Sequence, residues 1–252
     1  MDNLDRLNEK LCTRQRVFGY TAYLPSTYTL MDYMPDGVDY ILFDCEHGPY
    51  DEDWYAEYYR HCRALGIPTI TRVADAEYHF VARAADCGSD GVLIPRVETM
   101  EQVEAAVRGL YMPPIGKKGY GGKFQFYPGE TIEEYNRRRI LWIQIESPQG
   151  AELLPEILKT YPGLISACVI GPCDMSINAG TPLGFYTDES LAAIRKTYEV
   201  CAANGISSGS YCFDADDAGK RIALGTNLIW MQCDALFLAE GIRRAAETVA
   251  KL

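Results

Sequence analysis

The chain alternates between short apolar runs and longer segments whose apolar residues recur at helical spacing. Apolar runs bounded by turn residues are typical of strands buried on both faces, as in parallel sheets. These runs predict strands at residues 17–21, 38–43, 68–73, 91–94, 141–146, 165–170, 206–210 and 227–232. The helical pattern predicts helices at residues 2–15, 25–34, 51–64, 75–87, 99–111, 131–139, 151–160, 187–203, 214–224 and 235–252.

The regular alternation of strands and helices indicates an α/β protein with a parallel sheet. Eight strand–helix units within 252 residues fit a closed (β/α)8 TIM barrel better than an open sheet. Residues 112–129 are rich in Gly and Pro and predict a long loop, but this loop lies within the regular series. We therefore predict a single barrel domain over residues 1–252, preceded only by its N-terminal helix.

Composition narrows the range of partners. The net charge of -11 argues against binding to nucleic acid or to anionic membranes, because both require clustered Lys and Arg. No apolar run approaches the length of a membrane span, and the first residues lack the apolar region of a signal peptide. Nine Cys without a Cys-x-x-Cys pair fit reduced thiols. We expect a cytoplasmic protein that acts on small molecules.

Polar residues gather at the predicted strand ends. They are Asp44, Glu46, His47, Arg72, Gln144, Glu146 and Asp174. Barrel enzymes keep their active sites at the carboxyl ends of the strands, so we expect these side chains to converge on one pocket.

Glu146 and Asp174 follow neighbouring strands and predict a two-carboxylate metal site. Hard oxygen ligands with open positions suit Mg²⁺ or Mn²⁺, completed by water and substrate. The alternative is that both carboxylates cap the helices that follow them.

His47 and Arg72 have two interpretations each. His47 beside acidic residues suits a general base, but it could be a packed loop histidine. Arg72 suits an anion receptor, although an ion pair with Asp44 or Glu46 is nearly as well supported. No Lys stands at a predicted strand end, which argues against a Schiff-base mechanism.

The same segments resemble the HpcH/HpaI family of class II, metal-dependent pyruvate aldolases. The match is an ordered set rather than one motif. It comprises Phe43-Asp44-Cys45-Glu46-His47-Gly48-Pro49, Thr71-Arg72-Val73, Gly91-Val92-Leu93-Ile94-Pro95, Pro113-Pro114-Ile115-Gly116-Lys117-Lys118-Gly119, Gln144-Ile145-Glu146 and Gly171-Pro172-Cys173-Asp174-Met175-Ser176. Two departures are Lys118, where the family has a loop Arg, and Arg96, which could be an extra anion contact or a surface ion pair.

This resemblance implies a barrel of the phosphoenolpyruvate/pyruvate type that forms a homo-oligomer, a trimer or a hexamer, by exchanging its last helix. It also implies that Glu146 and Asp174 hold a divalent cation, Mg²⁺ or Mn²⁺ with Co²⁺ also compatible. The substrate-binding positions it implies are Arg72, Gln144, Gly171 and Cys173. The resemblance implies that Arg72 contacts the pyruvate oxo group during catalysis and that His47 acts as the base. It also implies that Asp86 orients His47.

The resulting hypothesis is cleavage of a 4-hydroxy-2-oxo acid to pyruvate and an aldehyde through a metal-stabilised pyruvate enolate. One alternative is a citrate-lyase-β-like carbon–carbon lyase that acts on an acyl-CoA. Another is a barrel that binds or assembles without catalysis, against which the intact acidic pair and His47 argue.

Overall fold

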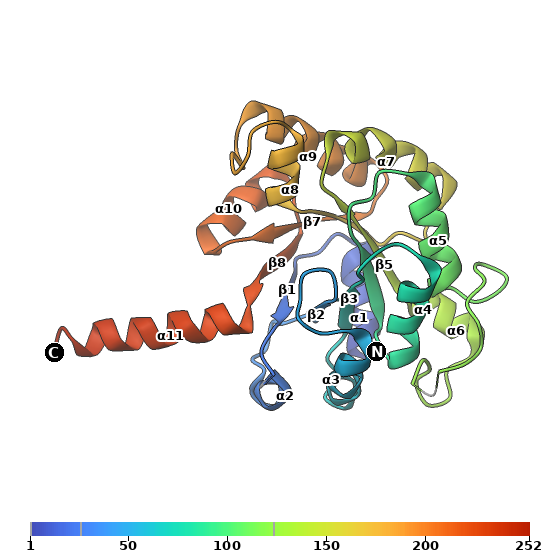
Figure 1. Cartoon of the computed structure of the whole chain (residues 1–252), viewed down its shortest axis with the longest axis horizontal. Helices are drawn as coiled ribbons and strands as arrows, with labels where there is room; N and C mark the ends of the chain where they lie inside the picture. The colour runs from blue at the N-terminus through green and yellow to red at the C-terminus, as the bar shows by residue number, and fades with distance from the viewer. Residues whose placement is uncertain (1, 26, 123) are drawn as a thin grey trace.

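The computed structural model describes residues 2–25, 27–122 and 124–252. Over these residues, eight parallel strands pair in chain order and close into a barrel surrounded by helices (Figure 1). The strands are β1 (Val17–Ala22), β2 (Tyr40–Asp44), β3 (Thr69–Arg72), β4 (Gly91–Ile94), β5 (Ile140–Ile145), β6 (Ala167–Ile170), β7 (Ser207–Cys212) and β8 (Leu228–Cys233). The predicted (β/α)8 barrel is confirmed.

The helices follow the predicted order with two differences. They are α1 (Asn3–Cys12), α2 (Thr27–Leu30), η1 (Met31–Tyr33), α3 (Glu52–Ala64), α4 (Tyr78–Cys87), α5 (Met100–Leu110), α6 (Ile132–Arg138), α7 (Pro148–Thr160), α8 (Pro172–Asn178), α9 (Asp188–Ala203), α10 (Ala215–Leu224) and α11 (Asp234–Val249). The helix predicted over 25–34 is instead a short α-helix followed by a 3-10 turn, α2 and η1. The sequence did not predict α8, which directly follows β6.

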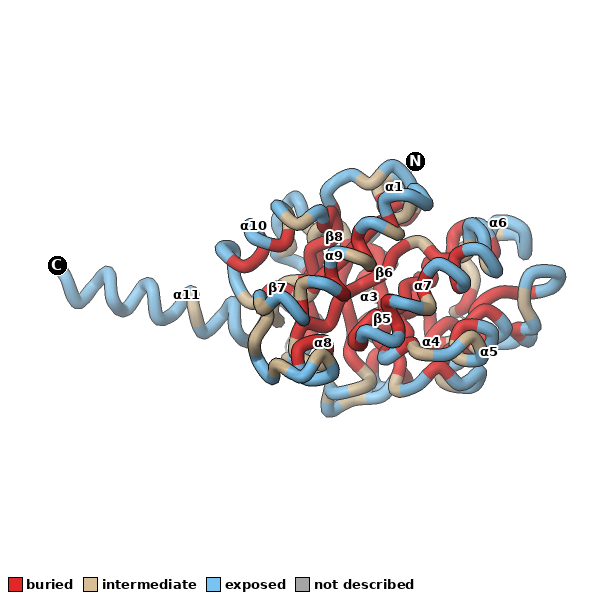
Figure 2. The backbone as a smooth tube through the Cα atoms, turned by 90° about the horizontal axis from the view of Figure 1, so that it is seen from above, coloured by how far each residue is buried: buried red, intermediate tan, exposed pale blue. Residues whose placement is uncertain are grey.

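The strands are buried on both faces, as the continuous apolar runs require. Figure 2 shows the strands as buried, while the outer faces of the helices are exposed. Inward-facing residues such as Trp142 and Leu228 fill the barrel, and Leu4, Leu7 and Leu11 of α1 pack against this cluster. The N-terminal helix therefore closes the amino end of the barrel.

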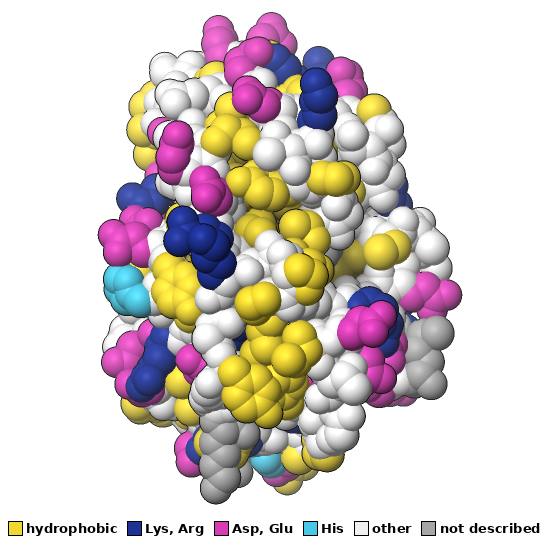
Figure 3. All heavy atoms as spheres, turned by 90° about the vertical axis from the view of Figure 1, so that its right-hand side faces the viewer, with side chains coloured by type: hydrophobic (Ala, Val, Ile, Leu, Met, Phe, Trp, Pro, Cys, Tyr) yellow, Lys and Arg dark blue, Asp and Glu magenta, His cyan; other side chains and the backbone are white. Residues whose placement is uncertain are grey.

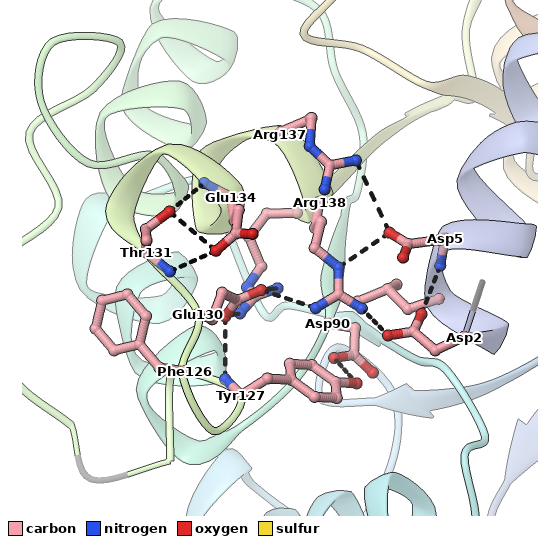
Figure 4. Close-up of polar contacts among 12 residues, drawn as sticks. Asp2, Asp5, Asp90, Phe126, Tyr127, Glu130, Thr131, Glu134, Arg137 and Arg138 are labelled. Atoms are coloured by element: carbon pink, nitrogen blue, oxygen red, sulfur yellow. Dashed lines mark hydrogen bonds and ion pairs between the residues drawn. The ribbon is translucent and has the colours of Figure 1, made fainter.

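A charged network reinforces that closed end (Figure 4). The guanidinium of Arg138 donates to Asp5 at 3.1 Å and to Glu130 at 3.2 Å, and it also pairs with Asp2. The Tyr127 hydroxyl donates to Asp90 at 2.8 Å, and the Tyr127 backbone N–H donates to Glu130 at 3.0 Å. These contacts tie α1 and α6 to the amino ends of the strands, which leaves the carboxyl end for chemistry.

The last helix, α11, projects away from the barrel (Figure 1), and its residues are exposed along nearly its whole length (Figure 2). Its exposed large apolar side chains are Leu236, Phe237, Leu238, Ile242 and Val249. On the opposite side of the molecule, over α4 to α6, hydrophobic side chains form a band down the middle of the face (Figure 3). Among the described residues, no helix is both long and apolar enough to cross a membrane.

Candidate active site

A cavity of about 340 Å³ opens at the carboxyl ends of the strands. The predicted residues that line it are Asp44, His47, Arg72, Gln144, Glu146, Gly171, Cys173 and Asp174. Of the predicted site residues, Glu46 and Asp86 do not line this cavity. A larger groove of about 1310 Å³ lies at the amino end between α1 and α6, away from these side chains.

Glu146 directly follows β5 and is held on three sides. Its side chain accepts a hydrogen bond of 2.6 Å from the Gln144 amide and one of 3.1 Å from the Arg96 backbone N–H. Gly171 provides the third side, because a Cβ at this position would overlap Glu146 Oε1. Gln144 and Glu146 lie on the same face of the strand, as their spacing of two predicts.

The surroundings of Glu146 are strongly anionic. Burial, together with the charges of Asp174 and Glu46, raises its pKa to about 8, because Arg72 and the Arg96 N–H only partly oppose these effects. The side-chain amide oxygen of Gln144, Oε1, beside it is buried and has no hydrogen-bond partner. An unpaired acceptor and uncompensated carboxylates are the environment in which a cation is stabilised.

The donor set fits a hard divalent cation, since it consists of carboxylate and amide oxygens. Within residues 2–25, 27–122 and 124–252, no group of three or more His, Cys, Asp or Glu side chains is gathered to hold a metal. Glu146 and Asp174 alone would therefore leave coordination positions for water or substrate, as Mg²⁺ sites commonly do.

Asp174 lies in the first turn of α8, the helix that the sequence did not predict. This helix begins with Pro172 at its first position, where the missing N–H costs nothing. Asn178 at its other end donates to the Glu146 backbone carbonyl at 2.8 Å. The helix therefore fixes the position of one acid and braces the strand end that carries the other.

Arg72 forms a two-pronged ion pair with Asp44 on the neighbouring strand. Its Nε donates to one carboxylate oxygen at 2.9 Å and its Nη2 to the other at 2.5 Å. A third nitrogen, Nη1, lies 3.2 Å from Glu46. Burial alone would raise the pKa of Asp44, but Arg72 and the backbone N–H groups of His47 and Glu46 hold it below its ordinary value. The predicted ion pair is present, and the guanidinium still lines the cavity.

His47 stands at the mouth of the cavity. Its side chain is 65% exposed, and its Nε2 lies 3.7 Å from Glu46. The same Glu46 carboxylate pairs with Arg96 at 2.9 Å, whose side chain is 58% exposed. Of the two interpretations of Arg96, the ion pair at the surface is therefore the one observed. His47 is not packed in a loop interior, so its ring is accessible to a substrate.

Asp86 is not brought to His47 within the chain. It lies in the last turn of α4, and this helix runs from the carboxyl end of β3 back to the amino end of β4. Its carboxylate instead forms an ion pair of 2.5 Å with Lys118, whose side chain is almost fully buried. The orienting role that the resemblance implies for Asp86 therefore has no support from contacts within one chain.

Sequence reasoning missed one side of the cavity. Tyr211 of β7, Phe213 just after β7 and Trp230 of β8 line it. The predicted seventh strand ended at Ser210, whereas β7 continues to Cys212 and turns Tyr211 inward. The alternation of Tyr211 and Phe213 was the available signal, because residues two apart along a strand share a face.

Comparison with known proteins adds to this geometry. The family model described as HpcH/HpaI aldolase/citrate lyase matches residues 22–239. The pyruvate aldolase of Rhizobium etli is 26% identical over 98% of both chains. The 2-keto-3-deoxy-L-rhamnonate aldolase of Klebsiella pneumoniae is 28% identical over 82% of this chain and 79% of its own. An HpcH/HpaI aldolase structure from Desulfitobacterium hafniense has a TM-score of 0.84 at 24% identity, covers 98% of this chain and 97% of its own, and shares the fold.

Proposed function

The chain belongs to the HpcH/HpaI aldolase/citrate lyase family, and we propose that this aldolase cleaves a 4-hydroxy-2-oxo acid into pyruvate and an aldehyde. The observation that carries the proposal is the gathering of two acids, Glu146 and Asp174, with Arg72 in one cavity at the carboxyl end of the barrel. Both sequence relatives described above bear aldolase names, which supports aldol cleavage over the acyl-CoA alternative.

We further propose that Glu146 and Asp174 hold a divalent cation, Mg²⁺ or Mn²⁺, with Co²⁺ as a compatible substitute. When bound, the cation polarises the 2-oxo group and offsets the negative charge that develops as the carbon–carbon bond breaks. The anionic environment of Glu146 and the unpaired oxygen of Gln144 support this assignment.

The remaining residues bind and orient the substrate. Arg72, fixed by Asp44, donates to the oxo group and stabilises the enolate charge. Gln144 lies beside the same group, and Gly171, which lies against Gln144 and Glu146, lines the cavity together with Cys173. Gly171 leaves room for the Glu146 carboxyl, because the Cβ of any larger residue at this position would overlap it.

His47 is proposed as the base that removes the proton from the 4-hydroxyl group. Its exposed ring at the cavity mouth and its contact with Glu46 support this role, which typically contributes about 10²–10⁴-fold to rate. Asp86 could orient His47 only if a second copy of the chain brought the two together. Its proposed role therefore depends on the oligomeric state.

The direct test is an assay of pyruvate release from 4-hydroxy-2-oxo acids. We expect release in the presence of Mg²⁺ or Mn²⁺ and its loss after treatment with a chelator. Re-addition of the cation should restore activity, which controls for denaturation by the chelator. Cleavage that a chelator leaves unchanged would remove the metal from the proposal, and cleavage of an acyl-CoA without pyruvate release would replace the aldolase assignment.

We also propose that the protein is a cytoplasmic homo-oligomer, a trimer or a hexamer, built from one barrel domain over residues 1–252. The apolar side chains exposed along α11 and the hydrophobic band over α4 to α6 support an assembly, since exposed apolar patches of this kind mark contact surfaces (Figure 3). We expect light scattering at micromolar concentration to give the mass of at least three chains. A monomeric mass would contradict the proposal.

A further inference from the structure

The cavity has two chemically different sides. Glu146, Asp174 and Arg72 lie on the side of β3, β5 and β6, and the side of β7 and β8 is aromatic. The two sides meet where the Arg72 guanidinium lies 5.0 Å from the centre of the Trp230 ring. We call Tyr211, Phe213 and Trp230 the aromatic wall. The Tyr211 ring lies 5.2 Å from Trp230 at 87° and 5.4 Å from Phe213 at 80°. These edge-to-face contacts are favourable and give the wall a fixed shape.

The aromatic wall offers little to a charged group. Of the described residues that line the cavity, Arg72 is the only Lys or Arg, and Asp44 and Glu46 already engage it. A substrate that carried a second carboxylate on the wall side would find no free cation there. It would also be repelled by the acids across the cavity.

Two polar side chains beside the aromatic wall are already paired, and the Tyr211 hydroxyl is the polar group that the wall itself contributes. The Trp230 ring N–H donates to the Thr21 hydroxyl at 2.7 Å, and the Gln232 amide donates to the Phe213 carbonyl. A polyhydroxylated group placed here would lose hydrogen bonds to water and find few replacements, which is costly.

The chain holds Phe213 in place by several contacts. Its ring lies 4.8 Å from that of Phe185, and its backbone N–H donates to Asp217 at 3.0 Å. Asp217 is fixed in turn by Arg221, which is fully buried. Gln232, which holds the Phe213 carbonyl, has a positive φ of 55°, a conformation that is unfavourable for a residue other than Gly. Such strained residues cluster at binding sites, where surrounding structure compensates for them.

We propose, building on the function above, that the aromatic wall binds the aldehyde half of the substrate and selects an aryl group at C4. The substrate class is then a 4-aryl-4-hydroxy-2-oxo acid, and the product is an aromatic aldehyde of the benzaldehyde type. The C3–C4 bond breaks, its electron pair remains on the pyruvate half, the 4-hydroxyl loses its proton to a base, and C3 then takes up a proton. A cavity of about 340 Å³ is near the lower end of the range for small-molecule sites, which suits pyruvate plus one ring.

The first test compares substrates that differ only at C4. We expect kcat/KM for 4-hydroxy-2-oxo-4-phenylbutanoate to exceed that of the 4-methyl analogue by about tenfold or more, because a hydrophobic pocket discriminates on this scale. An analogue whose C4 group ends in a carboxylate should be poorer still. A preference for the methyl or the carboxylate substrate would overturn the inference.

The second test alters the wall. Phe213→Leu should reduce the phenyl-to-methyl ratio of kcat/KM by about tenfold. Tyr33→Leu is the matched control, since Tyr33 is 84% exposed and lies outside the cavity, and it should leave the ratio unchanged. If Phe213→Leu fails to fold, acetophenone replaces it as a probe of the wild-type protein. It should inhibit cleavage of the phenyl substrate competitively, and acetone should not; equal inhibition by both would contradict the wall's role.

A third measurement separates this inference from the proposed function. Exchange of the pyruvate methyl protons in D₂O with Mg²⁺ or Mn²⁺, followed by NMR, requires no aldehyde. If exchange occurs and the phenyl substrate is not preferred, the aromatic wall does not select the aldehyde but the aldolase chemistry stands. If exchange does not occur and the phenyl substrate is not preferred, the proposed function itself is rejected.

Discussion

Replacing Glu146 with Gln is expected to lower kcat for pyruvate release by a factor on the order of 10³, because one of the two acids that would hold the cation loses its charge. The side chain keeps its size and can still accept a hydrogen bond from Gln144. Burial and the charges of Asp174 and Glu46 raise the pKa of Glu146 to about 8, so the metal-free fold already keeps this carboxyl largely neutral near neutral pH. The fold should therefore persist, and the lost activity would report the site alone.

Metal binding gives a second, activity-free measurement of the same variant. Mg²⁺ or Mn²⁺ should raise the Tm of the wild-type protein, because a ligand that binds only the folded state stabilises it. Glu146→Gln should abolish this increase. Glu133→Gln, an exposed acid on α6, is the control and should retain both the activity and the shift. A Glu146→Gln variant that keeps its cleavage rate and its metal-induced Tm increase would refute the two-acid site.

The fold was largely predictable because its signal is periodic and repeated. Strand β4 has the bounds that its apolar run predicts, residues 91–94, and β5 differs from its prediction by one residue at each end. Helix α8 was missed because seven residues that begin with Pro172 are too few to display a helical period. Strand β7 was cut short because its Ser- and Gly-rich sequence carries little hydrophobic signal.

The sequence predicted which residues form the candidate site, but it did not predict the contacts that they make with one another. The strand-end rule identified His47, Arg72, Glu146 and Asp174, which line one cavity. The partner of Arg72 depends on strand register, since Asp44 pairs directly with Arg72 across β2 and β3. Register and side-chain direction are set by tertiary packing and are not visible in one sequence. The position of Asp86 could have been predicted, because it falls at the end of the predicted helix 75–87, just before the amino end of the next strand.

Replacing Arg72 with Lys is expected to lower kcat/KM for the 4-hydroxy-2-oxo acid by about 10²–10³, although the charge is conserved. Two nitrogens of Arg72 donate hydrogen bonds to the two carboxylate oxygens of Asp44, and the third nitrogen forms an ion pair with Glu46. A single ammonium group cannot reproduce the geometry of the planar guanidinium with its three nitrogens. Lys would therefore pair with one carboxylate only, and its ammonium group would not be held in a fixed direction toward the substrate.

The split between the two kinetic constants distinguishes the possible roles of Arg72. If the guanidinium stabilises charge that develops during bond cleavage, kcat should fall with kcat/KM, whereas a role limited to holding the substrate carboxylate would raise KM alone. Arg96→Lys is the matched control, because Arg96 also pairs with Glu46 but its side chain is 58% exposed. We expect it to change kcat/KM by less than about threefold, since Lys keeps the charge at this position and the Arg96 side chain does not line the cavity. Equal losses in the two variants would mean that Glu46, rather than contact between Arg72 and substrate, governs the rate.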